Sequence, residues 1–208
     1  AIVLCLVGSE MCIRDSWYSQ AGTPKVKVIE RYGENTLTLD FEQILPNNRT
    51  KKLQPMVIPI SIGLLDENGI DLIETKVFEL KKPKDTLTFK GIEKKPTVSL
   101  LRKFSAPVTI EREITDQDRL TLLTKDSDAY NRWDASQQLM LASFEKIAFQ
   151  KQDPSDELID AFCQIMQDQK LMPAFRAQLL SQPSISEIIA HFFKNNLPID
   201  CLLYTSDA

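Results

Sequence analysis

Few residues of this 208-residue chain could carry metal-based or nucleophilic chemistry. His191 is the only histidine. A histidine can act as a general base or as a metal ligand, but in the apolar string IIAHFF at 188–193 we expect a hydrogen-bonded structural role instead. A single histidine also excludes the His-Glu-x-x-His motif of zinc peptidases from this chain.

The remaining candidates for chemistry are two pairs of acids. Asp116 with Asp118, and Asp126 with Asp128, could serve acid–base catalysis or bind calcium. Both pairs lie at expected helix starts, where carboxylates complement the helix dipole, and this structural role is preferred. The string GTP at 22–24 lacks the Lys and Ser/Thr of a phosphate-binding loop. The sequence therefore predicts no catalytic, metal-binding or substrate-binding residue in this chain.

Two unlike strings near the ends of the chain, EMCIRDS at 10–16 and CLLYTS at 201–206, can be read as inverted copies of one DNA element. One permitted coding of the first contains AGATGTGTATAAGAGACAG, and the reverse complement, read from its second base, encodes the second. The element resembles a transposon adapter used to fragment DNA for sequencing. We therefore interpret residues 1–16 and 201–208 as adapter-derived, not native, and codons 16 and 200 as hybrids.

Excluding these ends changes the cysteine count and the charge. Cys163 becomes the only native cysteine, so no disulfide and no four-ligand Cys/His zinc site is expected, and a cytoplasmic, reducing compartment is predicted. The excluded ends carry one basic residue, Arg14, and three acidic ones, Glu10, Asp15 and Asp207, so the formal net charge moves from -4 to -2.

This charge and the hydropathy pattern suggest neither a nucleic-acid nor a membrane partner. A small net negative charge gives no general attraction to either. The lysines Lys81, Lys82 and Lys84 are expected to line a solvated turn. No apolar run approaches the roughly 20 residues that a membrane helix needs.

The first half of the remaining chain is strand-like. The string NTLTLDF at 35–41 alternates apolar Leu37, Leu39 and Phe41 with polar residues, the pattern of a half-buried strand. Six further extended runs are expected at 26–29, 56–65, 72–80, 86–92, 97–104 and 107–114. Seven short strands without an intervening helix favour an antiparallel, immunoglobulin-like β-sandwich over residues 25–114.

Turn residues separate these runs. The Asn-Gly pair in DENG at 66–69 suits a tight hairpin, and KKPKD at 81–85 forms a polar break. Pro59 cannot donate a hydrogen bond to a neighbouring strand, so an edge or a bulge is expected there.

From residue 115 to residue 200 the hydrophobic period becomes helical. A long helix is expected with a stripe of large apolar residues facing inward, interrupted by Gln137. This stripe consists of Tyr130, Trp133, Met140, Phe144 and Ile147. A second helix is expected at 155–169, between Pro154 and Pro173, with Leu158, Phe162, Ile165 and either Cys163 or Met166 facing inward. Pro173 and Ser184 should start two more helices, the latter through a capping box with Glu187. Such helices in series suggest an all-α helical-repeat domain, of which residues 115–200 would form the start.

Four strings in register give the chain a family resemblance. They are WYSQAGTP at 17–24, SLLRKFSAPV at 99–108, DAYNRWDASQQL at 128–139 and PAFRAQLLSQPS at 173–184. Together they resemble bacterial aminopeptidase N, a family of zinc metalloaminopeptidases of the gluzincin type, over nearly all of residues 17–200. The resemblance implies that residues 17–24 are the tail of a catalytic domain, followed by the sandwich and by the opening helices of the last domain.

The resemblance implies a zinc-dependent parent protein that removes N-terminal amino acids from peptides. In that family the zinc ligands, the general base and the substrate-binding acids precede the part that corresponds to this chain, so the chain itself would bind no zinc and have no activity. Its role would be to space and cover the active site, and the sequence does not indicate an oligomeric state. The alternative is an adaptor or surface protein that binds its partners through a sandwich module and helical repeats, because sandwiches serve many functions.

Overall fold

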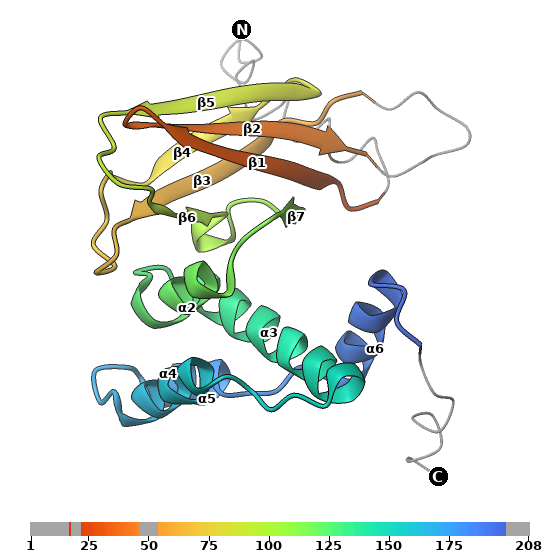
Figure 1. Cartoon of the computed structure of the whole chain (residues 1–208). Helices are drawn as coiled ribbons and strands as arrows, with labels where there is room; N and C mark the ends of the chain where they lie inside the picture. Colours follow the sequence, from red (N-terminus) through yellow and green to blue (C-terminus); the bar gives the residue numbers. More distant parts are fainter. Residues whose placement is uncertain (1–16, 18–21, 46–53, 199–208) are drawn as a thin grey trace, which may run out of the picture. The chain divides into compact units, whose positions relative to one another are not determined.

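The structure is a computed structural model that describes residue 17 and residues 22–45 and 54–198. The predicted adapter-derived segments, 1–16 and 201–208, lie outside the described residues. The chain divides into two compact units, one ending at Thr115 and one beginning at Asp116. The first contains the strands and the second the helices (Figure 1).

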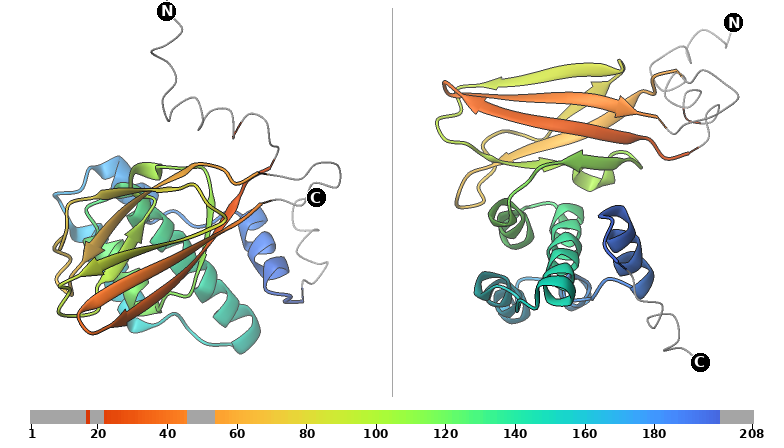
Figure 2. Two further views of the ribbon diagram at one scale, coloured as in Figure 1. Left: turned by 90° about the horizontal axis from the view of Figure 1, so that it is seen from above. Right: turned by 45° about the vertical axis from the view of Figure 1, so that its right-hand side comes forward.

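The first unit is the predicted β-sandwich, and all seven expected strands are present. They are β1 (Lys25–Gly33), β2 (Thr36–Ile44), β3 (Ile58–Leu65), β4 (Lys76–Leu80), β5 (Lys84–Lys90), β6 (Thr97–Leu100) and β7 (Thr109–Arg112). They form a four-stranded sheet in the order β5-β2-β1-β7 and a three-stranded sheet in the order β4-β3-β6. Figure 2 shows the sandwich from two further directions.

The core lies between the two sheets. Leu37 and Leu39 of β2 and Ile60 of β3 are fully buried at 0% exposure. Their neighbours in β2 point to the other face of the sheet, because successive side chains in a strand alternate. The alternation seen at 35–41 in the sequence is therefore confirmed, except that Asn35 belongs to the turn before the strand. Glu34 and Asn35 both have positive φ, 51° and 55°, as the two central residues of a tight β1–β2 hairpin require.

The expectation of a purely antiparallel sandwich was wrong at β7. This strand pairs parallel with β1, from Lys25 opposite Thr109 to Val28 opposite Arg112. The chain reaches β7 from β6, a strand of the other sheet, so it enters the four-stranded sheet through a crossover and not through a hairpin. Crossovers permit parallel pairing, whereas a two-residue hairpin does not.

Four predicted strands are shorter than expected; the runs at 56–65 and 107–114 are strands only over Ile58–Leu65 and Thr109–Arg112. The run at 72–80 is a strand only from Lys76, and the run at 97–104 ends as a strand at Leu100. The chain then forms a 3-10 turn, Arg102–Phe104. Leu101, just before this turn, and Lys103 and Phe104 within it have φ of 57°, 57° and 50°. Such left-handed residues cannot continue a strand.

Pro59 lies where the sequence required an edge. β3 is the central strand of its sheet, but β6 pairs only with the segment from Ile62 to Leu65. At Pro59 the strand is paired with β4 alone, opposite Glu79, so the missing N–H leaves no gap in a second ladder.

Between residues 116 and 198, the second unit contains five α-helices. They are α2 (Asp116–Lys125), α3 (Ala129–Glu145), α4 (Asp156–Gln167), α5 (Pro173–Leu179) and α6 (Ile185–Lys194), and a π-helical turn, Lys146–Gln150, extends α3. Pro173 is the first residue of α5, as predicted. The capping box at α6 is also confirmed: Ser184 Oγ accepts from the Glu187 N–H, and the Glu187 carboxylate accepts from the Ser184 N–H.

The predicted inward faces of α3 and α4 were partly wrong. Of the expected α3 stripe only Met140 is buried, Tyr130, Trp133 and Phe144 are half-buried, and Ile147 is exposed. The buried positions are instead Asn131, Ala135, Ser136, Gln137, Leu139, Met140 and Leu141. Polar residues can be buried here because they find hydrogen-bond partners: Ser136 and Gln137 donate to the carbonyl oxygens of Leu179 and Ser181, and Asn131 donates to Asp128. On α4, Leu158 and Ile165 are buried as expected, but Ala161 is buried in place of Phe162, Cys163 and Met166.

Candidate functional site

His191 is hydrogen-bonded, as the sequence predicted. Its Nε2 lies 2.8 Å from Glu145 Oε2, at the end of α3. The Nδ2 amide of Asn195 donates to the same carboxylate oxygen at 3.0 Å. The side chain of His191 is 19% exposed, and its neighbour Phe192 contacts Phe149 edge-on with ring centroids 5.0 Å apart. The group ties α6 to the end of α3.

The first pair of acids lies at a helix start, as expected. Asp116 and Asp118 occupy the first turn of α2. The Asp116 carboxylate accepts from Arg119 Nη1 at 3.0 Å and from Lys146 Nζ at 3.1 Å. Burial raises the pKa of Asp116, but the hydrogen bonds and charges of the two cations outweigh it, so the net pKa is lowered from 3.8. A paired carboxylate with a lowered pKa is a poor general base.

The second pair of acids forms the cap of α3. Asp128 is the N-cap, and its Oδ1 accepts from the backbone N–H of Asn131 at 3.1 Å. Asp126 Oδ1 accepts from the backbone N–H of Asp128 at 2.9 Å. The nearby hydroxyl of Tyr130 has its pKa raised to about 12 by burial, then by the charges of Asp134 and Asp128. These carboxylates satisfy backbone donors, which is a structural task.

The lysines at the polar break are held in surface ion pairs. Lys81 pairs with Glu79, and Lys84 pairs with Glu42 at 2.9 Å. Both lysine side chains are more than half exposed, at 54% and 73%. Lys81 and Lys82 lie in an exposed break between strands, as expected, but Lys84 is already the first residue of β5.

The surface of the described residues includes a depression in each unit. One, of about 400 Å³, lies in the sandwich unit between the 66–72 turn and residues 91–96, and the ion pair of Lys94 with Glu67 spans its rim. The other, of about 260 Å³, lies between α2 and α4. Within the described ranges, no group of three or more His, Cys, Asp or Glu side chains could hold a metal ion. Cys163 is exposed on α4.

The buried and multiply hydrogen-bonded Arg102 was missed by the sequence reasoning. Its guanidinium is 4% exposed and donates to Ser99 Oγ at 3.0 Å, Thr75 Oγ1 at 3.1 Å and Asp71 Oδ1. A Cβ on Gly63 of β3 would lie 2.0 Å from its Cζ atom. The only sequence signal was a glycine inside a strand run, which indicates a close approach. Arg102 fastens the loop before β4 to the end of β6.

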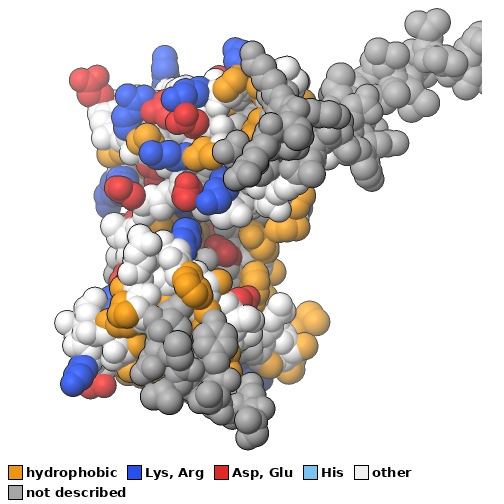
Figure 3. All heavy atoms as spheres, turned by 90° about the vertical axis from the view of Figure 1, so that its right-hand side faces the viewer, with side chains coloured by type: hydrophobic (Ala, Val, Ile, Leu, Met, Phe, Trp, Pro, Cys, Tyr) orange, Lys and Arg blue, Asp and Glu red, His pale blue; other side chains and the backbone are white. Residues whose placement is uncertain are grey.

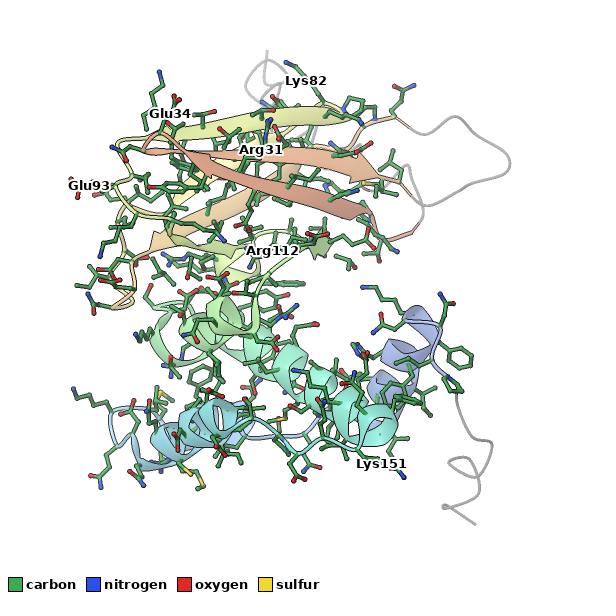
Figure 4. The ribbon with its side chains drawn as sticks, viewed as in Figure 1. Arg31, Glu34, Lys82, Glu93, Arg112 and Lys151 are labelled. Atoms are coloured by element: carbon green, nitrogen blue, oxygen red, sulfur yellow. The ribbon has the colours of Figure 1, made fainter. Side chains whose placement is uncertain are left out.

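A second arginine, Arg112, joins the two sheets. Arg112 of β7 pairs with Glu30 of β1 at 3.0 Å and donates to the carbonyl oxygen of Val98 at 2.8 Å. Val98 lies in β6, in the other sheet. Arg112 and Arg31 are labelled in Figure 4 on strands β7 and β1. Arg102 and Arg112 therefore each connect segments of the sandwich that are far apart in the sequence.

The fold defines a class: an immunoglobulin-like sandwich followed by helical repeats. Residues 22–113 match a domain of unknown function with an Ig-like fold, DUF3458. Residues 116–201 match the associated domain of unknown function described as ARM repeats, DUF3458_C. The predicted fold class is therefore confirmed.

The named proteins that this chain resembles are aminopeptidases. The chain is 32% identical over 192 residues to aminopeptidase N of Escherichia coli, and 35% identical over 184 residues to aminopeptidase N of Caulobacter vibrioides. Each match covers 85% of this chain but only 22% and 21% of the relative. A crystal structure of Legionella pneumophila aminopeptidase A in complex with aspartic acid superposes with a TM-score of 0.74 at 29% identity, covering 84% of this chain and 20% of that one.

The chain contains the DUF3458 and DUF3458_C domains and is similar to aminopeptidase N over 85% of its length. The family resemblance seen in the sequence is confirmed, and the chain spans about a fifth of the length of these curated relatives. In the part of the chain that the structure describes, no helix is both long and apolar enough to span a membrane.

Proposed function

We propose that this chain is the non-catalytic sandwich and helical-repeat portion of a zinc-dependent aminopeptidase, a hydrolase that removes N-terminal amino acids from peptides. The observation that supports it is the similarity to aminopeptidase N along 85% of this chain, confined to about a fifth of the relative. The donor set fits no zinc site: His191 is engaged by Glu145, and the described residues hold no other ligand cluster. Zinc binding and peptide hydrolysis therefore belong to the parent protein outside this chain.

The proposed division follows the change of period in the sequence. Residues 17–24 are the tail of the catalytic domain, 25–114 the sandwich and 115–200 the opening of the helical domain, with adapter-derived residues at 1–16 and 201–208. The sandwich spaces the helical domain from the catalytic one, and the helical domain covers the active site so that small peptides enter. With Cys163 as its only native cysteine, the protein fits a reducing, cytoplasmic compartment.

Two measurements test this proposal. The purified chain should bind no stoichiometric zinc and release no amino acid from an alanyl reporter substrate, and metal-dependent turnover would contradict the proposal. In an untruncated clone, the DNA upstream of codon 17 should encode His-Glu-x-x-His with a further glutamate downstream. Additional sandwich or repeat modules at that place would instead support an adaptor protein.

A further inference from the structure

Helices α4 and α6 both expose apolar side chains to solvent. Hydrophobic side chains gather on the side of the helical unit seen in Figure 3, where α6 lies. A second set lies along α4, where Ile159 is 48% and Met166 55% exposed, Cys163 is exposed and Phe162 is half-buried. Spacings of three and four residues place these side chains in one stripe along the helix. We call Ile159, Phe162, Cys163 and Met166 the α4 stripe.

The helix that carries this stripe is anchored within the chain. Its inner side buries Leu158, Ala161 and Ile165. Helices α2 and α5, which both belong to this chain, pack against α4, and Ser155 caps its N-terminus. The stripe is therefore a second apolar face of a helix whose first face is already covered. Exposed apolar faces of this kind are typical of contact surfaces.

The two ends of α4 carry opposite charges. Asp156 is exposed in the first turn. At the other end, Lys170 is exposed in the turn after the helix, and the Arg176 guanidinium donates to the carbonyl oxygens of Met166 and Asp168 at 3.2 Å each. These two cations outnumber the carboxylate of Asp168. Two α4 helices packed antiparallel would therefore place an acidic end against a basic end, whereas parallel packing would place like charges together.

The stripe has the symmetry that a two-fold interface requires. In an isologous dimer the same patch of both copies is used, so each contact occurs twice. With the two-fold axis between Phe162 and Cys163, Ile159 of one copy faces Met166 of the other, and Cys163 approaches its own counterpart. The same register brings Asp156 of one copy within one residue of Lys170 of the other. Apolar and charged positions are thus matched by a single arrangement.

We propose that the α4 stripe binds a second copy of this chain, as an antiparallel two-fold pair of α4 helices with Cys163 beside the axis. The stripe supplies the apolar seam, and the charges at its ends favour the antiparallel direction. A single helix seam buries less than the roughly 800 Å² per partner of a stable dimer, so the dimer should be weak and its population should rise with concentration. The proposal is independent of the aminopeptidase proposal, because it uses only surfaces of this chain.

Chemical crosslinking at Cys163 tests the register. In the 208-residue chain with Cys5→Ser, Cys12→Ser and Cys201→Ser, a short bismaleimide should join the Cys163 thiols of two copies. The matched control moves the thiol by one residue, as Cys163→Ser/Gln164→Cys. Gln164 is also exposed but lines the depression between α2 and α4, so its covalent dimer should form about tenfold more slowly. Equal crosslinking rates at the two positions would overturn the proposal.

Sedimentation equilibrium of the chain over a range of concentrations tests the contacts. Ile159→Lys and Met166→Lys should each weaken dimerisation about tenfold, because each buries a charge in the seam. Far-UV circular dichroism should be unchanged, since both native side chains are about half exposed. Asp156→Lys or Lys170→Glu alone should weaken dimerisation about fivefold, and the double variant, in which the two charges are exchanged, should restore it.

The outcomes separate the possible interfaces. A chain that stays monomeric at every concentration would overturn the proposal, as would dimerisation that survives both lysine variants of the stripe. Dimerisation that Phe193→Lys removes and Ile159→Lys does not would assign the contact to α6, and would also overturn it. A charge-exchanged double variant that associates no better than the single variants would contradict the antiparallel pairing and with it the proposal.

Discussion

The two units of this chain bury their apolar residues to different degrees. In the sandwich, the core residues of both sheets, such as Leu39 and Ile60, are completely buried. Among the described residues, ten large apolar side chains of the sandwich are fully buried, whereas in the helical unit only Leu123 and Leu179 are. Two sheets packed face to face complete a core by themselves, whereas each helical repeat depends on its neighbours. The sandwich is therefore a closed unit and the helical layer an open one.

The tryptophans allow each unit to be followed separately. The chain has only two, and Trp17 bonds to the carbonyl oxygen of Val57 beside β3, while Trp133 lies on α3. In a Trp133→Phe background, fluorescence reports the sandwich, and in a Trp17→Phe background it reports the helical unit. Urea titrations of the two backgrounds measure the free energy of unfolding of each unit.

The largest effect is expected from deleting a core side chain of the sandwich. Leu39→Ala removes a fully buried side chain between the sheets and should lower the free energy of unfolding of the sandwich by about 4 kcal/mol. Phe193→Ala, in the helical unit, should change its unfolding free energy by less than about 0.5 kcal/mol, because the ring is mostly exposed. Equal losses in the two units would contradict the distinction between a closed and an open unit.

A slightly smaller loss should follow from Gly63→Ala. The added methyl group would overlap the Arg102 guanidinium, which is buried and held by Ser99, Thr75 and Asp71. Displacing this cation from its partners should cost about 3 kcal/mol of sandwich stability. The control compares the double variant Gly63→Ala/Arg102→Ala with Arg102→Ala alone. Once the guanidinium is gone, the added methyl group should change the free energy of unfolding very little. If the double variant is again about 3 kcal/mol less stable than Arg102→Ala alone, overlap with the guanidinium is not the cause of the loss.

The sequence predicted the sandwich better than the helices, for the same physical reason. Alternating residues such as Leu37, Leu39 and Phe41 identify a strand and its buried face locally. This works because only one face of each sheet contacts the core between the sheets. The buried face of α3 depends on which helices pack around it, so the large residues Tyr130 and Trp133 were misplaced inward. That dependence on neighbours is not encoded in the helical period.

Interactions between distant residues were also beyond local patterns. Capping boxes and N1 prolines involve residues within one turn, and these were predicted correctly. The contacts of Arg102 with Asp71 and the parallel pairing of β7 with β1 join segments far apart in the sequence. His191 is an intermediate case, since its apolar neighbours indicated a structural role but not its partner, Glu145.

A moderate effect, confined to the helical unit, is expected from the cap of α6. Ser184→Ala removes the oxygen that accepts from the Glu187 N–H and should lower the stability of the helical unit by about 1 kcal/mol. The sandwich, followed through Trp17, should be unaffected. Gln138→Ala, at an exposed position of α3, is the control and should have little effect. A loss in both units would indicate that they unfold together.

The smallest effect is the pH dependence of the same cap. Hydrogen bonds from the Ser184 side chain, then from its backbone N–H, lower the pKa of Glu187 from 4.5. A carboxyl group whose pKa is lowered on folding stabilises the folded state above the unfolded value, and this contribution is lost as the pH falls below about 4.5 through the folded value. Glu187→Gln keeps a capping-box side chain but cannot titrate.

The measurement is the difference between wild type and Glu187→Gln in the urea midpoint of the helical unit, followed through Trp133. The Glu187 carboxylate is almost fully exposed, so water screens its interactions and the difference should be smaller than the loss from Ser184→Ala. The wild type should be more stable near pH 6, and its advantage should shrink near pH 3. Comparing the two proteins at each pH cancels the titration of other carboxylates, including Asp116, whose pKa is also lowered. An advantage that grows on acidification would show that protonated Glu187 is the better cap.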